Sequence, residues 1–527
     1  MNGQPSIRDQ LSGFPIFQMA LIGLLRLSEP IAFASFLSYI FFMIKSFRIA
    51  KNDADVSRFS GYLASAFSFS QFLSSVQWGH AADKYGRKPI ILVGCLGTAL
   101  SMLVFGFSPN FYVAFLARVM MGLLNGNVSI MRTIVGEIAV EKRHQGIAFS
   151  NLSLIWSLGK AIGYYLSGIL TDVDHFRDYD NDKEQQQQIE KPGRREAQQM
   201  GIFARFPFAF SNIVVASMIF SFVILGWLFL EETHDVVKYK RDRGLEVGDK
   251  VRSLLGFEVP ERPWQQVKDE AADHLISSTS SDKDDEEEEE YEMQSFSSDY
   301  TPTIVEEPVL TSPIIYRIAC NFLLSFSNVI YAEFLPVFLA KTIDAKSLKF
   351  PFLIKGGFGF TTSEIGTLLS VTGVIAVVLV SLGFPVINKY LTVLTAFRMG
   401  LLFMPIAYFC LPLIIFTIPQ YSHLSPKLTN SLLFTEATAI GFIQSLLFSQ
   451  VTLLVHRVSP KKHRGLVNGY TISITALARF ISPLIWGYVM TGLDVKNVGG
   501  LSWWLLGTAC FFAFCVTLMM NEDDDLE

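Results

Sequence analysis

The sequence contains few charged residues and few cysteines. Only 17% of its 527 residues are Asp, Glu, Lys or Arg, whereas 50% are hydrophobic and 46 are Phe. A water-soluble chain could not bury so much apolar surface, so a soluble globular protein is excluded. All five cysteines fall within apolar runs, which argues against a disulfide framework. The sequence also has no Gly-rich phosphate loop and no nucleophile–base arrangement, so it predicts neither ATP-driven chemistry nor an enzyme, and no cofactor or nucleic acid.

Long apolar runs are the dominant feature of the sequence. Runs of about 20 apolar residues match the hydrocarbon thickness of a bilayer, and backbone groups in lipid must be satisfied within each segment. The sequence therefore predicts an all-α integral membrane protein whose surface faces the lipid bilayer. Twelve crossings are expected, at 14–43, 60–82, 89–107, 110–136, 147–170, 205–230, 313–340, 361–387, 393–417, 429–455, 465–490 and 499–520.

Two polar stretches interrupt these runs and divide the chain. The stretch 231–312 holds an acidic run at 282–290 and predicts a largely disordered linker between two six-helix halves, 14–230 and 313–520. Serines at 277–300 beside the acidic run are candidate sites for a kinase. The second stretch, 171–204, is a loop within the first half. Short polar ends are expected at 1–13 and 521–527. An internal repeat supports two halves, because 140–168 aligns without gaps on 459–487.

A charged turn separates the second and third apolar runs. It reads Gly-His-Ala-Ala-Asp-Lys-Tyr-Gly-Arg-Lys-Pro over 79–89, and its glycines permit a tight reversal. This pattern resembles the loop between helices 2 and 3 of the major facilitator superfamily. With Trp78 it is similar to the zinc-induced-facilitator-like branch of the drug:proton antiporters of plants and fungi. The resemblance implies the major facilitator fold, a cytosolic turn, cytosolic termini, and a vacuolar or plasma membrane location. It also implies conformational gating by five residues of the turn: Gly79, Asp83, Gly86, Arg87 and Lys88. In the family, the matching Asp contacts the start of helix 11.

Helices 4 and 5 carry further family patterns. The resemblance extends to Arg118, Gly122 and Gly126 in helix 4, where the two glycines share one face and permit close packing. In helix 5 the antiporter pattern is incomplete. Gly146, Gly159 and Gly163 are kept for helix packing, but Lys160 replaces a proline and Tyr164 replaces a glycine.

Several charged residues fall near the middle of apolar runs, where an unpaired charge is costly. The repeat aligns Lys160 with Arg479, so together with Arg26 they are predicted to bind an anionic group of the substrate. The alternative is that each cation pairs with a carboxylate such as Glu29. Arg26 and Glu29 are three residues apart and able to pair. Glu29 and Arg118 are the predicted proton-coupling residues, and the alternative for Arg118 is a structural pair with a helix-1 carboxylate.

Two weaker groups of acidic residues complete the candidates. Glu333 and Glu436 are interpreted as rim residues near the outer ends of their helices. Glu231, Glu232 and His234 follow helix 6, but their spacing lacks a full ligand set, so no metal site is expected.

The sequence therefore predicts a secondary active transporter that moves a small organic solute, anionic or a metal chelate, by alternating access with proton coupling. The rival hypothesis is a receptor or tether that keeps this fold without transporting and signals through the acidic linker.

Overall fold

The computed structural model describes residues 13–138, 142–171, 205–234, 236–265, 310–422, 424–460 and 464–522. Over these residues the chain is helical, and its few β-bridges are isolated. The first group of helices comprises α2 (Ile16–Ser35), α3 (Ile40–Ser46), α4 (Asp53–Tyr85), α5 (Arg87–Gly106), α6 (Phe111–Leu123), α7 (Asn127–Ile138), α8 (Lys142–Leu170) and α12 (Ala209–Phe229). The linker contributes η1 (Val237–Tyr239) and α13 (Arg243–Leu254). The second group comprises α15 (Ser312–Ala340), η2 (Ala345–Ser347), α16 (Thr362–Tyr390), α17 (Val393–Cys410), η3 (Leu411–Thr417), α18 (Pro419–Ser422), α19 (Pro426–Val458), α20 (Arg464–Val495) and α21 (Leu501–Thr517).

These helices account for twelve crossings of a membrane. Within the described part of the chain, eight spans are long and apolar enough to cross a bilayer: α2, α5, α12, α15, α16, α17 with η3, α19 and α20. The shorter apolar helices α6 and α21 add two, and α3 and α7 extend α2 and α6 after short breaks. The more polar helices α4 and α8 are the remaining two crossings. Polar side chains can be accommodated in them because each packs against a helix of the other half and does not face only lipid. The predicted all-α membrane bundle is confirmed.

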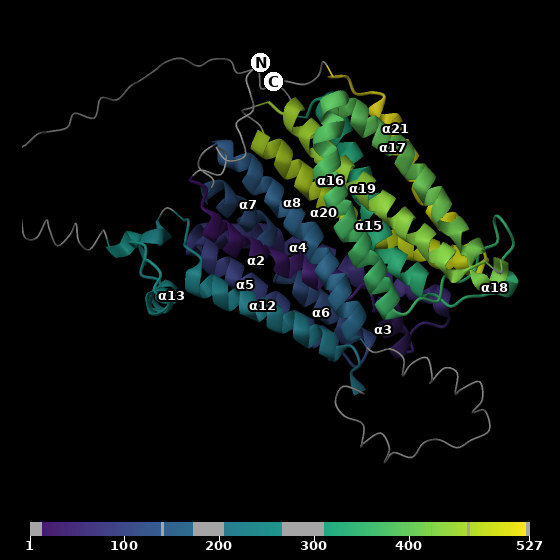
Figure 1. Ribbon diagram of the computed structural model, residues 1–527, viewed down its shortest axis with the longest axis horizontal. Helices are drawn as coiled ribbons and strands as arrows, with labels where there is room; N and C mark the ends of the chain where they lie inside the picture. The colour runs from purple at the N-terminus through teal and green to yellow at the C-terminus, as the bar shows by residue number, and fades with distance from the viewer. Residues whose placement is uncertain are drawn as a thin grey trace, which may run out of the picture.

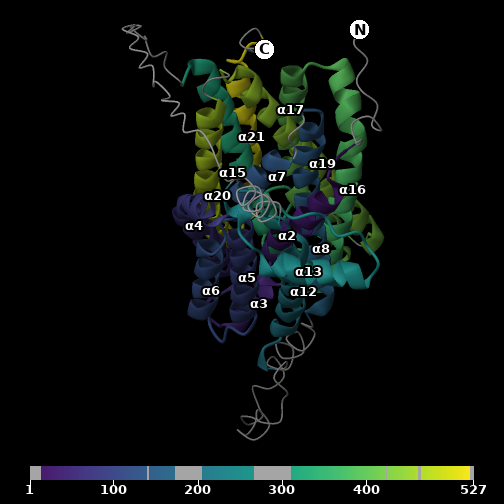
Figure 2. The same ribbon diagram turned by 90° about the vertical axis from the view of Figure 1, so that its left-hand side faces the viewer.

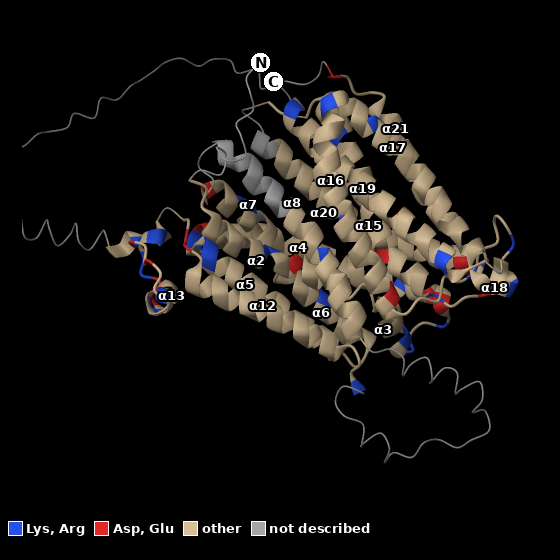
Figure 3. Cartoon of the chain, viewed as in Figure 1, with Lys and Arg blue, Asp and Glu red and all other residues tan. Residues whose placement is uncertain are grey.

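The bundle consists of two groups of six crossings. Figure 1 shows α2 to α12 together in purple to teal and α15 to α21 together in green to yellow. We call the end at which α12 ends and α15 begins the linker end, and the opposite end the closed end. Lys, Arg, Asp and Glu gather toward the ends of the helices, with few in the middle of the bundle (Figure 3). The two groups meet along α4 with α20 and along α8 with α16.

The two groups touch most closely at the closed end. A Cβ on Gly61 of α4 would lie 2.2 Å from the carbonyl oxygen of Pro483 in α20. In the second seam, a Cβ on Gly366 of α16 would lie 2.5 Å from the carbonyl oxygen of Tyr164 in α8. Because no Cβ fits at these distances, glycine is what allows the backbones to approach. The seams also carry hydrogen bonds between the groups. Ser65 Oγ donates to Phe480 O at 3.0 Å, Thr491 Oγ1 to Ala54 O at 2.8 Å, and Thr362 Oγ1 to Thr171 O at 3.0 Å.

Both seams open toward the linker end. On α20, a Cβ at Gly469 would meet nothing within 4 Å, and the same holds for Gly79 near the end of α4. On α16, a Cβ at Gly373 would be in ordinary contact, 3.7 Å from Ala161 Cβ. Side chains that would continue the first seam, such as Val76 and Ile472, are exposed. The halves therefore diverge from the closed end toward the linker end.

A buried ion pair at the closed end ties two helices of the second half together. Lys341, after α15, donates to Asp494 near the end of α20, and both side chains are buried. Replacing Lys341 by Met leaves the Asp494 carboxylate buried without a partner. We therefore expect Lys341→Met to destabilise the protein by about 3 kcal/mol or more. Thermal unfolding in detergent measures this loss. The double variant Lys341→Met/Asp494→Leu should recover most of the stability, and no difference between single and double variants would contradict this explanation.

The break between α6 and α7 is stabilised by one face of α4. Trp78 Nε1 donates to Leu123 O at 2.7 Å, Ser74 Oγ to Gly122 O at 3.3 Å, and Gln71 Nε2 to Asn125 O at 3.4 Å. These three donors occupy positions i, i+3 and i+7 of α4, so they share one face. They satisfy carbonyl groups that the interrupted helix leaves free. Trp78, a residue of the family-like pattern before the turn, therefore also has a structural role.

The described part of the linker is folded. Residues 236–265 include α13, which packs on α12, and Asp242 caps this helix by accepting from Gly244 N at 2.8 Å. The expected lack of structure is therefore wrong for these residues. The acidic run and the candidate kinase region lie outside the described residues.

Candidate functional site

A cluster of charges lies between the two halves. Arg132 of α7 is close enough to Arg26 and Glu29 of α2, and to Arg479 of α20, for their charges to interact. We call these four residues the central charge cluster. Arg26 and Glu29 are nearly buried, whereas Arg132 is exposed. Since Arg132 lies beside a residue of the opposite half, its exposure indicates that solvent reaches the space between the halves. Three cations face one carboxylate there, so the cluster carries an excess of positive charge.

Within this cluster, Arg26 and Glu29 form an ion pair along α2, as the sequence predicted. Gln71 Nε2 of α4 also donates to Glu29 Oε1 at 3.4 Å. The Arg26 guanidinium lies over the ring of Trp156 in α8, 5.0 Å from its centroid, a cation–π contact that holds the arginine toward the middle of the bundle. One carboxylate is therefore shared by Arg26 and Gln71.

Lys160 is half-buried on α8 and makes no hydrogen bond or ion pair with the described residues. The alternative that it pairs with Glu29 is therefore not what the structure shows. Arg479 is also half-buried, and its Nε has no hydrogen-bond partner in the described chain. The repeat identified both positions, but the structure places Arg479, not Lys160, in the cluster. Arg132 was missed, because nothing in its sequence context distinguishes it from an arginine near a helix end.

Arg118 lies apart from Glu29. Its side chain is 1% exposed, its guanidinium lies 3.9 Å from the Phe36 ring centroid and 4.9 Å from that of Phe67, and its Nε donates to Leu63 O at 3.3 Å. The alternative for Arg118, a structural pair with a helix-1 carboxylate, is not what the structure shows, because Glu29 pairs with Arg26 instead. The carboxylate whose charge reaches Arg118 is Glu333 of α15, in the other half.

The interpretation of Glu333 and Glu436 as rim residues is also wrong. Both side chains are buried, and Glu333 Oε2 and both oxygens of Glu436 lack a hydrogen-bond partner in the described chain. Their distance along the helix from the middle of the membrane suggested exposure. Glu333 is buried where α15 packs against α3 and α4 of the first half, whereas Glu436 is buried by the second-half helices around α19.

The α4–α5 turn is bound by the chain that follows α12. Gly86 has a φ of 103°, and Glu232 accepts from the backbone N–H groups of Arg87 at 2.9 Å and Lys88 at 3.1 Å. A carboxylate at this position caps the start of α5 and complements its dipole. Arg87 also bridges Asp83 at 3.3 Å and Glu137 at 3.1 Å. In this conformation the Asp83 side chain is 71% exposed and pairs with Arg87, and the described residues show no ion pair between it and the start of α20.

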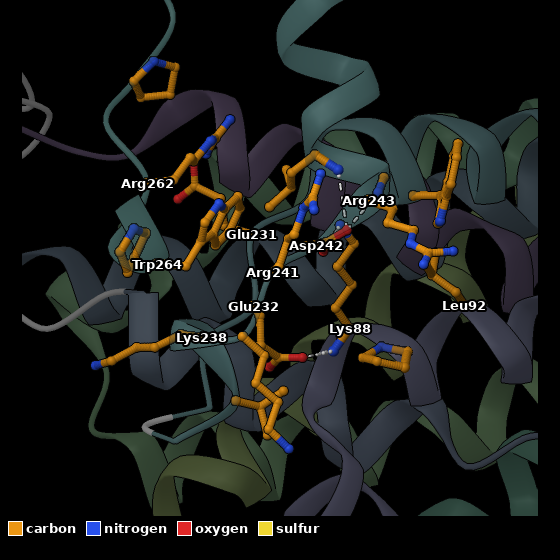
Figure 4. Close-up of a pocket in the computed structure, with 18 of the residues that line it drawn as sticks. Lys88, Leu92, Glu231, Glu232, Lys238, Arg241, Asp242, Arg243, Arg262 and Trp264 are labelled. Atoms are coloured by element: carbon orange, nitrogen blue, oxygen red, sulfur yellow. Dashed lines mark hydrogen bonds and ion pairs between the residues drawn. The ribbon is translucent and has the colours of Figure 1, made fainter. Parts of the chain in front are cut away.

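A pocket lies beside this turn at the linker end. Figure 4 shows the side chain of Lys88 reaching Asp242, with Glu232 beside the Lys88 backbone. The Lys88 Nζ to Asp242 Oδ2 distance is 2.6 Å. On the far side, Arg262 contacts Asp249 at 2.5 Å and Glu231 at 2.7 Å. Burial by itself would lower the pKa of Arg262, but its hydrogen bonds to Asp249 and Glu231 raise this pKa above its ordinary value. The acidic side chains after α12 therefore form ion pairs with Lys88 and Arg262. The described residues contain no group of three metal-ligating side chains.

The predicted packing glycines lie at helix contacts. A Cβ on Gly122 would lie 2.3 Å from Phe67 O, and one on Gly126 would lie 2.2 Å from Trp78 Cβ. On α8, a Cβ on Gly159 would lie 2.5 Å from Pro30 Cγ and one on Gly163 would lie 2.6 Å from Ile31 O, so α8 packs tightly on α2. Gly146 lies within α8, and its surroundings are outside the described side chains.

Two six-crossing halves that meet at one end and enclose charged groups between them are the architecture of a membrane transporter. The chain belongs to the Major Facilitator Superfamily, whose family model matches residues 31–483. Proteins of this family are multi-pass membrane transporters of small molecules, not enzymes.

Three similar proteins illustrate the match. The major facilitator superfamily multidrug transporter mfsB of Aspergillus fumigatus is 31% identical over 98% of this chain and 85% of its own length. The protein ZINC INDUCED FACILITATOR 1 of Arabidopsis thaliana is 25% identical over 89% of this chain and 83% of its own length. A bacterial homologue of the human lysosomal transporter Spinster, in an inward-facing and occupied conformation, has a TM-score of 0.62 at 13% identity and covers 98% of this chain and 99% of its own. The predicted family is confirmed.

Proposed function

We propose that this transporter carries a small organic anion through the space between its halves. The observation that supports this most is the central charge cluster, in which Arg26, Arg132 and Arg479 face the single carboxylate of Glu29. A net positive site in a water-accessible space within the membrane attracts an anionic group and disfavours a free metal cation. Lys160 of α8 has no ion pair with the described residues and lies outside this cluster, and it stays a proposed binding residue for the anion. An anionic metal chelate would meet the same charges.

Glu29 is the proposed proton-coupling residue. As a carboxylate it holds Arg26 and opposes an incoming anion. Once protonated, it releases Arg26 to bind that anion, so the binding of a proton and of an anion favour each other. For an anionic substrate this linkage moves the proton and the anion in the same direction. The resemblance to drug:proton antiporters implies the opposite direction, which would require competition at the same site.

The proposed orientation places the linker end in the cytosol. The α4–α5 turn lies at this end, and its counterpart in the family is cytosolic. The divergence of the halves toward this end is then an inward-open conformation, with both termini and residues 231–312 cytosolic and 171–204 on the other side. The proposed membrane is vacuolar or plasma, and the half-bundles are 14–230 and 313–520.

Flux into vesicles containing the purified protein tests the proposal. A panel of labelled organic anions, cations and neutral solutes is offered with and without an imposed pH gradient. We expect saturable uptake of an anion, accelerated when the gradient drives protons in the same direction. Uptake of cations only would contradict the anion proposal, and acceleration by the opposite gradient would contradict the proton linkage. If no solute moves, the receptor or tether hypothesis is favoured.

Asp83 provides a test of the gating role. In the inward-open conformation the Asp83 carboxylate is exposed and its ion pair with Arg87 contributes little, so Asp83→Asn should leave expression and thermal stability near normal. If this carboxylate stabilises the opposite conformation by contacting the start of α20, the variant should slow transport severalfold. Flux at saturating substrate measures the effect. Unchanged flux in Asp83→Asn would contradict the gating role.

A further inference from the structure

The folded part of the linker lies across the end of α12. Figures 1 and 2 show that α13 runs across α12 instead of continuing along it. The crossing is close, because a Cβ on Gly244 would lie 2.3 Å from Trp227 O and one on Gly248 would lie 1.9 Å from Leu228 O. A helix that crosses the end of a membrane-spanning helix lies along the membrane surface.

Contacts with two spans fix the depth of α13. The Arg252 guanidinium lies 4.6 Å from the ring centroid of Phe17 and 5.4 Å from that of Phe229. Phe17 is the second residue of α2, and Phe229 is the last residue of α12. Both mark the ends of apolar spans, so the end of α13 lies where the hydrocarbon meets the lipid headgroups.

The outer surface of this segment is both apolar and basic. Leu254, Leu255 and Phe257, at the end of α13, are 87%, 68% and 67% exposed. Four cations are exposed: Arg241 pairs with Glu246, whereas Lys240, Arg243 and Lys250 form no ion pair with the described residues. Three of the five acidic side chains in 236–265 are engaged in ion pairs, since Asp242 binds Lys88, Asp249 binds Arg262 and Glu246 binds Arg241. The other two, Glu258 and Glu261, are exposed in the chain that follows α13. Exposed leucine and phenylalanine beside unpaired cations are what an interfacial helix presents to an anionic membrane.

We propose that α13 and the residues on either side of it form a membrane-surface anchor for anionic lipid. The side chains of Leu254, Leu255 and Phe257 insert at the level of the headgroups, while Lys240, Arg243 and Lys250 bind lipid phosphates and carboxylates. The buried ion pairs of Lys88 and Arg262 hold this surface rigidly against the first half. Binding therefore fixes one half to the membrane surface independently of the substrate carried between the halves.

The full-length protein in lipid nanodiscs tests the anchor. Amide hydrogen exchange over 243–257 is compared in phosphatidylcholine alone and in phosphatidylcholine with phosphatidylserine. We expect exchange to be about tenfold slower or more with phosphatidylserine, since each basic residue near such a surface adds to binding. The variant Lys240→Gln/Arg243→Gln/Lys250→Gln should lose this dependence. The matched control Lys346→Gln/Lys349→Gln/Lys427→Gln, three exposed lysines at the closed end, should keep it.

A second measurement examines the apolar side chains. A fluorophore attached at Leu255→Cys should be quenched by lipids labelled near the headgroup, and a fluorophore at Lys346→Cys serves as reference. Equal exchange in both lipids, together with no quenching at position 255, would overturn the proposal. Protection that is the same in both lipids but disappears when the acidic residues of 282–290 are neutralised would also overturn it, because the chain's own acidic run would then cover this surface.

Discussion

The variant Gly366→Ala should transport about tenfold more slowly than the wild-type protein. Its new Cβ would lie 2.5 Å from Tyr164 O and 2.7 Å from Gly168 Cα, so α8 and α16 could not approach as they do at the closed end. Overpacking of this kind costs about 1–3 kcal/mol, and about 1.4 kcal/mol changes an equilibrium tenfold. The cost falls only on the conformation in which the closed end is shut. The variant should therefore accumulate with that end open, and initial rates of uptake into vesicles measure the loss.

The matched control lies two turns away on the same helix. At Gly373 the new Cβ would be 3.7 Å from Ala161 Cβ, an ordinary contact, so Gly373→Ala should transport at a near wild-type rate. Alanine favours a helix over glycine at both positions, so neither variant should fail to fold for reasons of propensity. Equal rates for Gly366→Ala and Gly373→Ala would show that closure of this seam is not part of the transport cycle.

The variant Arg479→Gln should bind the transported anion about 10- to 100-fold more weakly. Hydrogen bonds that involve a charged group contribute about 1.5–3 kcal/mol, and Arg479 has no ion pair that its loss would leave unsatisfied in the described chain. Stability should therefore change little, whereas the half-saturation concentration for flux should rise. Isothermal binding in detergent and concentration-dependent uptake measure the effect independently.

Charge and shape can be separated at this position. Arg479→Lys keeps the positive charge but loses the planar guanidinium, so it should retain part of the affinity. Lys427→Gln removes an exposed cation at the closed end and should have no effect on affinity. Unchanged affinity in Arg479→Gln would contradict a role for this arginine in substrate binding, and an equal loss in Lys427→Gln would point to a nonspecific effect of net charge.

The crossings and the family could be predicted because their signals are local. Apolar runs define the twelve crossings, and the turn at 79–89 is a contiguous motif. The pairing of Arg26 with Glu29 was predictable for the same reason, since the two residues are three positions apart on one helix. The breaks after Ser35 and Leu123 were not, because they depend on contacts with other helices. At the second break, the Leu123 carbonyl group accepts a hydrogen bond from Trp78 of α4, which is 45 residues away in the chain.

The arrangement of charges between the halves could not be deduced from the sequence. The position of a residue along a helix gives its depth in the membrane but not the direction in which its side chain points. Glu333 and Glu436 were therefore expected at the rim, although both are buried. Arg118 and Glu29 are both charged residues within apolar runs, yet one lies among aromatic rings and the other in the central charge cluster. The folded linker was also missed, because α13 is stabilised by its contacts with α12 and by Asp242, which binds Lys88 far away in the chain.

The central claim is that the two halves rock about the space that holds the central charge cluster. Distances between spin labels on exposed positions test it most directly, with one pair across the linker end at His80 and Lys389 and a second across the closed end at Lys51 and Lys427. When the transported anion and a pH gradient are supplied, we predict that the linker-end distance shortens while the closed-end distance lengthens. Distances that stay unchanged at both ends during measurable flux would contradict alternating access.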